Sequence, residues 1–423
     1  MNVKNNVTLK KRLVKKALAG AAVLSLGLAI STDVLATPRD QAKRIHDRLA
    51  GVPPTNAVLT DMENDINGIG DGLGVADGTA KGAAYTAMEN SAFYNVTLKN
   101  FAAPWTNRDQ TVFVDLNDYI ATVIGLVRDD EDFRQALYGD VIYIGNSSLG
   151  LPAYSNSNNN HYEQLESRGE DLKTALVQAP QSQVTGLPSS ATAGLMTTRA
   201  AAQAFFIAGT NRAMLRFTLL NHLGRDLEQL KDNTLPADRI RQDVSRSPGG
   251  DSRIFLNNCV GCHTGMDPLA QAFAYYNFLY DPDNDPAGLN GQIQYNDVGA
   301  TDPVTGTRVQ EKYHINSTNF APGFITPNDN WDNYWRVGTN SLLGWDTSLP
   351  GSGSGAKSMG MELANSRAFA EYQVVKVFRS VCLREPGDSA DRQLVSDTAD
   401  LFIADTYNMK TVFAEVAVYC MGP

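Results

Sequence analysis

TTRAAAQAFFIAGTNRAMLRFTLLNHLG, the stretch at residues 197–224, sets the expected fold of this chain. Apolar side chains recur in it and just after it at the spacing of one helix face; they are Phe205, Phe206, Leu215, Leu219, Leu220, Leu223 and Leu227. The pattern predicts one long helix over residues 200–230. Because no series of alternating strands occurs elsewhere in the chain, we expect a mainly α fold.

Further helices are expected on both sides of this stretch. The helical patterns cover residues 38–59, 86–94, 116–126 and 162–177, and three C-terminal helices are expected at 361–381, 391–403 and 410–419. Residues 281–357 show no sustained periodicity, which predicts a long irregular loop region. The polar run SNSNNN at 155–160 is the best linker candidate.

The charge balance excludes several classes of partner. The 423 residues include 36 Lys and Arg against 46 Asp and Glu. Residues 1–36 hold six basic side chains and one acidic one, so the remainder carries 30 basic against 45 acidic side chains, a formal charge of −15. Such a surface repels phosphate backbones and anionic lipid, so we expect no nucleic-acid partner and no binding to anionic membrane surfaces.

The N-terminus has the pattern of an export signal. Six cations precede an apolar or small run at residues 17–30, and small Val34 and Ala36 follow at cleavage-site positions. A run of this length is too short to cross a bilayer but suits a secretory signal. We therefore expect cleavage near Ala36, a periplasmic or otherwise exported product, and no stable membrane insertion after cleavage. A retained membrane anchor is the alternative.

Residues 259–263 read CVGCH and carry the sharpest chemical signal. Two thiols three positions apart can each add to a vinyl group of one haem, and the adjacent histidine can then bind the iron. The motif predicts one haem c attached through Cys259 and Cys262, with His263 as the proximal iron ligand. A thiol–disulfide exchange motif would need a thioredoxin-like βαβ context, and a zinc site would need further ligands.

The motif lies in a longer stretch that resembles a known family. Residues 197–224 followed by CVGCHTGMDPLAQAFAYYNF (259–278) resemble the monohaem domains of planctomycete-type cytochrome proteins, a family built on a domain of unknown function. The C-terminal MELANSRAFAEYQVVKVFRSVC (361–382) and FAEVAVYC (413–420) resemble the helical domain that closes those proteins. The resemblance implies an exported, mainly α c-type cytochrome-like haem domain.

These observations suggest four parts in the chain. They are a signal peptide at 1–36, an N-terminal helical region at 37–154, a haem-bearing region at 161–357 and a C-terminal helical region at 358–423. Asp267 and Pro268 are expected to open a helix, because Asp caps helices and Pro is tolerated at their first position.

The second axial iron ligand is left open by the sequence. Met266 lies three residues after His263 on the same segment and cannot reach the opposite face of the iron. The candidates are Met359, Met361 and His314, although each Met could be ordinary core filler and His314 an ordinary histidine. A five-coordinate iron is also possible.

Two further sets of residues are predicted from their positions. Arg199, Arg212 and Arg216 are candidates to bind the haem propionates, because a guanidinium binds a carboxylate through two hydrogen bonds. Cys382 and Cys420 end the first and third of the C-terminal helices, whose ends would meet in an up-down-up arrangement. In an oxidising compartment this predicts a disulfide; the alternative is two buried free thiols.

The leading functional prediction is electron transfer by an exported monohaem c-type cytochrome, which acts as a carrier rather than an enzyme. Its expected redox partner is a protein with a basic face. The alternative is a haem enzyme or gas sensor with an open distal iron position. A third class is a binding or scaffold protein with a structural haem. The distal position of the iron discriminates between the first two functions: a Met or His ligand there favours electron transfer, and an open position favours the enzyme or sensor.

Overall fold

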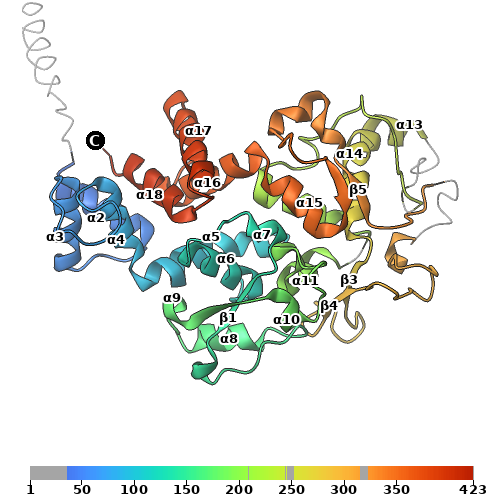
Figure 1. Ribbon diagram of the computed structural model, residues 1–423, viewed down its shortest axis with the longest axis horizontal. Coiled ribbons are helices and arrows are strands. Elements are labelled where there is room, and N and C mark those ends of the chain that lie inside the picture. The colour runs from blue at the N-terminus through green and yellow to red at the C-terminus, as the bar shows by residue number, and fades with distance from the viewer. Residues whose placement is uncertain (1–35, 208, 243, 245–251, 315–322, 423) are drawn as a thin grey trace, which may run out of the picture. The chain divides into compact units, whose positions relative to one another are not determined.

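Of the residues that the structure describes, 52% are helical and few lie in strands, which confirms the expected mainly α fold. The computed structural model describes residues 36–207, 209–242, 244, 252–314 and 323–422, and Figure 1 traces them from α2 to α18. Of the predicted signal peptide at 1–36, all but Ala36 lies outside the described residues.

The N-terminal helices are α2 (Pro38–Leu49), α3 (Asn56–Ile66) and α4 (Ala80–Met88), which pack on one another, while α2 and α4 also contact α18 (Met409–Tyr419). The single helix expected over 38–59 is therefore wrong. Pro53 and Pro54 separate α2 from α3, because proline has no backbone N–H and disfavours helical backbone in the preceding residue. Thr55 then caps α3 by accepting a hydrogen bond from the Val58 N–H at 3.3 Å.

The central helix α6 (Asp118–Arg128) is buried at every residue but the last. It contacts β1 (Ile142–Gly145), and Gly125 permits this contact because a Cβ there would lie 2.1 Å from the Tyr143 ring. The other elements before residue 198 are η1 (Phe93–Leu98), α5 (Lys99–Ala102), η2 (Ala103–Thr106), α7 (Gln135–Tyr138), η3 (Ser147–Leu149), α8 (Asn160–Ser167), α9 (Leu172–Ala175), β2 (Leu176–Ala179), α10 (Gln181–Thr185) and η4 (Gly194–Thr197).

The helix expected over 162–177 is also interrupted. Gly169, with a φ of +67°, separates α8 from α9. Leu176 and Val177 belong to β2, where they pair with Gly145 and Ile144 of β1 in an antiparallel ladder. Strand pairing therefore overrides the local helical pattern at these two residues.

The long helix expected over 200–230 is divided into α11 (Arg199–Phe205), α12 (Arg212–Thr218) and the π-helical turn η5 (Leu219–Leu223). Asn211 adopts a φ of +59°, and its side-chain amide donates to the carbonyls of Phe273 and Tyr276. These contacts fix a backbone conformation that breaks the helix. η5 ends at Gly224, whose φ of +67° is typical of a helix C-terminus.

Helices and strands, most of them short, occur throughout the described residues between 252 and 354. Several of them lie in the stretch 281–357, which was expected to be irregular. The elements are α13 (Ser252–Ile254), η7 (Phe255–Cys259), α14 (Val260–Ala270), η8 (Gln271–Phe273), β3 (Tyr276–Leu279), β4 (Gln292–Tyr295), η9 (Glu311–Tyr313), β5 (Asn330–Asp332), η10 (Tyr334–Arg336), η11 (Gly338–Leu343) and β6 (Ser352–Ser354). β3 pairs with β4 and β5 with β6. Buried Trp331, Trp335 and Trp345 anchor the second half of this region in the main core.

The C-terminal segment contains α15 (Gly355–Ala364), α16 (Arg367–Cys382), α17 (Ser389–Ala404) and α18. The first of the three expected helices is thus two helices, because Ser366 caps α16 by accepting from the Phe369 N–H. α16, α17 and α18 pack against one another, as Figure 1 shows. Cys382 and Cys420 lie at disulfide distance, with Cα atoms 5.5 Å apart.

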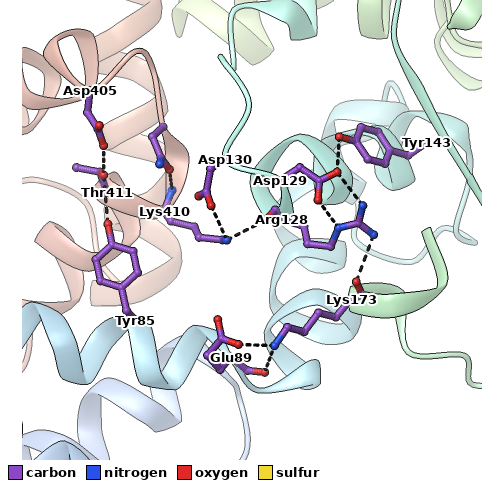
Figure 2. A network of polar contacts seen from close by, with 11 residues as sticks. Tyr85, Glu89, Arg128, Asp129, Asp130, Tyr143, Lys173, Asp405, Lys410 and Thr411 are labelled. Carbon is purple, nitrogen blue, oxygen red and sulfur yellow. Dashed lines mark hydrogen bonds and ion pairs between the residues drawn. The ribbon is translucent and has the colours of Figure 1, made fainter. Parts of the chain in front are cut away.

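A polar network connects the N-terminal, central and C-terminal helices (Figure 2). The Lys410 ammonium donates to the carbonyl of Arg128 at 2.8 Å and to the Asp130 carboxylate at 3.1 Å. Lys173 donates to the Glu89 carbonyl at 2.8 Å. All of these bonds join residues of one compact unit, which comprises residues 38–421.

The stretch proposed as a linker is bonded to neighbouring segments. Asn156 donates to the carbonyl of Thr185 at 3.0 Å and Asn159 to that of Leu116 at 2.9 Å. The boundaries between the N-terminal, haem-bearing and C-terminal regions, expected near residues 154–161 and at residue 357, stay predictions.

Candidate functional site

The CVGCH motif lies where the π-helical turn η7 passes into α14. Cys259 ends η7, and Cys262 and His263 lie in the first turn of α14. Cys259 is three positions from Cys262 and four from His263, and residues at these spacings are neighbours on a helix surface. Both cysteines are free thiols and partly buried, and burial raises the pKa of the Cys262 thiol.

His263 is oriented by a carboxylate one turn further along α14. Its Nδ1 lies 3.1 Å from Oδ2 of Asp267, and the imidazole is 17% exposed. An Nδ1–H donated to a carboxylate fixes the tautomer and the ring orientation, and makes Nε2 a more basic ligand. The contact therefore prepares Nε2 to bind a metal.

Asp267 is completely buried and is held by two arginines. Arg212 Nε lies 2.8 Å from its Oδ1, and Arg241 Nη2 lies 3.8 Å from the same atom. Burial alone would raise the pKa of Asp267, but the two guanidinium groups and the bond from His263 hold it well below its ordinary value. The carboxylate is therefore ionised at neutral pH.

The prediction that Asp267 caps a helix at Pro268 is wrong. Both residues lie inside α14, which runs from Val260 to Ala270. The Asp-Pro pair matches the local signal of a helix start, but the helix is already formed at Val260. Asp267 instead neutralises two arginines and positions His263.

Two glycines of α14 are packed against residues far away in sequence. A Cβ at Gly265 would lie 2.1 Å from Trp335 Nε1, and one at Gly261 would lie 2.2 Å from Asn233 Oδ1. These two glycines are four residues apart and therefore share a face. The close approach they allow fixes the rotation of α14 about its axis, and hence the direction of the cysteines and His263.

Apolar side chains lie next to the motif. Phe255, Ile240 and Val244 form a small buried cluster against which Cys259 packs. The ring of Phe255 lies 5.9 Å from that of His263. The motif therefore has apolar neighbours next to both Cys259 and His263.

The three candidates for the second iron ligand lie in different environments. Met361 is 40% exposed on α15, and Met359 is fully buried in the main hydrophobic core. His314 follows η9 and is partly buried, and its Nε2 is a buried atom with no hydrogen-bond partner.

The three arginines proposed for the propionates have separate roles. Arg212 contacts Asp267, as described. Arg199 is buried and donates to the carbonyls of Gly291 and Gly288. Arg216 makes two hydrogen bonds to Asp226. All three guanidinium groups are therefore already bonded to the protein.

The donor set is compatible with a covalently attached haem. Two free thiols and an oriented imidazole lie at the junction of η7 and α14, beside apolar side chains. A zinc site gains no support, because the described ranges contain no group of three or more His, Cys, Asp or Glu side chains placed to hold a metal ion. A thioredoxin-like setting gains none either, since η7 and α14 follow the short helix α13 rather than a strand.

Two residues of the site were missed by the sequence analysis. Arg241 and Trp335 lie in segments without periodicity, and each meets α14 only through the tertiary fold. Their residue types alone gave no signal, because most arginines are solvated and most tryptophans are core residues.

No family model, curated protein or solved structure matches this chain. Across the part of the chain that the structure describes, no helix has both the length and the apolar character that crossing a membrane requires.

Proposed function

We propose that this protein is an exported monohaem c-type cytochrome that transfers electrons. The observation that carries the proposal is the CVGCH segment, in which His263 is oriented by the buried, ionised Asp267. A bound haem would supply an iron that takes up and releases one electron.

Each residue of the site has a defined role in this proposal. The thiols of Cys259 and Cys262 would each form a C–S bond with a vinyl carbon, the thiol hydrogen passing to the other carbon. His263 would bind the iron through Nε2. Asp267 holds the imidazole in one tautomer, and Arg212 and Arg241 keep that carboxylate charged.

The charge of the chain supports a partner of opposite sign. Beyond residue 36 the formal charge is −15, which favours encounter with a protein that has a basic face. The redox partner in this proposal is such a protein.

The test is the visible spectrum of the dithionite-reduced full chain, produced in a host that attaches c-type haem, before and after carbon monoxide. Sharp low-spin bands that carbon monoxide leaves unchanged are the expected result, because both axial positions are then filled by the protein. A large Soret shift on adding carbon monoxide would show an open position and replace electron transfer with the enzyme or sensor function.

A further inference from the structure

We infer that His314 is the second axial ligand of the haem, so that the iron is held by two histidines. This inference rests on the proposed function and adds the ligand that the sequence left open. It is drawn from the burial of one nitrogen atom and from the contacts that hold its segment against α14.

The Nε2 atom of His314 is buried and has no hydrogen-bond partner. Buried polar atoms in folded proteins are almost always paired, so an unpaired imidazole nitrogen needs an explanation. Neutral imidazole is also the commonest nitrogen ligand of metals in proteins. Coordination to iron would satisfy this atom.

His314 belongs to a segment that is fastened to the motif helix. The preceding residue, Tyr313, donates its hydroxyl to the carbonyl of Ala270, the last residue of α14, at 3.0 Å. The Arg241 guanidinium lies 4.7 Å from the centre of the Tyr313 ring. Arg241 also reaches Asp267, which orients His263. His314 therefore adjoins the same network that positions the proximal ligand.

The start of this segment, at Gln310, is also held by hydrogen bonds. The backbone N–H of Gln310 donates to the Ala274 carbonyl at 2.9 Å, and its side chain donates to the Tyr275 carbonyl at 3.0 Å. The backbone N–H of His314 itself donates to the backbone carbonyl of Glu311 at 2.7 Å. A ligand on such a segment is held in place before the haem arrives.

The two methionines lack a comparable signal. Met361 is 40% exposed, and Met359 is fully buried in the main core. Next to Met359, Gly360 packs against the Leu137 carbonyl. Burial of a thioether requires no partner, so packing accounts for Met359.

His222 also has an unpaired buried nitrogen, Nδ1, but its setting differs. Its Nε2 is bonded to the Tyr119 hydroxyl at 2.9 Å, and its ring packs against Trp105 and Phe369. One ring nitrogen is thus already used and the ring is enclosed by core aromatics. His222 serves as a matched control.

The experiment uses the full haem-loaded chain in its ferric state and records near-infrared magnetic circular dichroism and electron paramagnetic resonance. The wild type should give the signature of two axial histidines and lack the long-wavelength band of a sulfur ligand. His314→Gly should become high-spin, and added imidazole should restore the low-spin spectrum. His314→Met should remain low-spin with a higher midpoint potential, since a methionine ligand raises it. Met359→Leu and His222→Gln should leave the signature unchanged.

The outcomes separate the two proposals. A methionine signature in the wild type, or a low-spin iron in His314→Gly without imidazole, would overturn the assignment of His314 and leave the cytochrome intact. A wild-type chain without any haem would overturn the proposed function itself and His314 with it. The wild-type spectrum decides the question even where a variant fails to fold.

Discussion

At the scale of single residues, the site depends on one buried carboxylate. Asp267 is completely buried, with Arg212, Arg241 and His263 around it. Arg241 is itself 1% exposed, so two charges are sequestered from water and stabilise each other. Removing one partner of such a pair leaves the other uncompensated.

Asp267→Asn should therefore lower the free energy of unfolding by about 3–5 kcal/mol, since it removes a buried negative charge that faces the Arg212 and Arg241 guanidinium groups. Asp226→Asn is the matched control, because Asp226 pairs with Arg216 at the surface and such pairs contribute about 1 kcal/mol or less. Urea denaturation of both variants measures the difference. Equal, small effects for the two variants would contradict the role given to Asp267.

Lys312 predicts a pH dependence. Its side chain is 8% exposed, and burial lowers its pKa from 10.5 to about 7. Between these values the unfolded chain binds the proton more strongly than the folded one, so stability should rise as pH rises from about 7 toward 10.5.

Lys312→Met should flatten this rise, which amounts to up to about 5 kcal/mol. The measurement is urea denaturation across that pH range, with exposed Lys43→Met as the control that keeps the wild-type slope. A wild-type slope in Lys312→Met would show that Lys312 is not the group responsible.

At the scale of elements, α14 is positioned by close packing at Gly261 and Gly265. Gly265→Ala places a Cβ against the Trp335 indole, and overpacking of this kind costs about 1–3 kcal/mol. We expect a lower melting temperature and less attached haem per chain. Gly387→Ala is the control, because a Cβ there has no neighbour closer than 3.9 Å. Unchanged stability and haem content in Gly265→Ala would refute the packing argument.

The C-terminal helices provide a second test at this scale. A bond between Cys382 and Cys420 closes a loop of 38 residues, which should stabilise the fold by about 4 kcal/mol on the chain-entropy model. Reduction should lower the melting temperature of the wild type and leave the Cys382→Ala, Cys420→Ala double variant unaffected. Peptide mapping that finds both thiols alkylated in the unreduced chain would rule the bond out.

At the scale of the whole molecule, the acidic surface should govern encounter with redox partners. The haem-loaded chain should be oxidised by hexaammineruthenium(III), a cation, at a rate that falls as salt is added, because salt screens the attraction. The rate with ferricyanide, an anion, should rise instead. The same salt dependence for both reagents in stopped-flow measurements would show that the net charge does not act at the site of electron exchange.

The sequence predicts the helical class of this molecule well and its interruptions poorly. Periodicity marks a helix face over 200–230, but the break at Asn211 depends on carbonyls more than 60 residues away. Four-residue strands contain too few alternations to be recognised. The motif at 259–263 is visible because its chemistry is local, whereas the contribution of Arg241 depends on tertiary contacts.

The central claim is that one haem is bound covalently through two cysteines, and the most direct test combines intact mass with the pyridine haemochrome spectrum. The chain should carry the mass of one haem after denaturation and give the spectrum of a haem with both vinyl groups saturated, while Cys262→Ala should lose the double attachment. A wild-type chain of polypeptide mass alone, with Cys259 and Cys262 open to alkylation, would contradict the account.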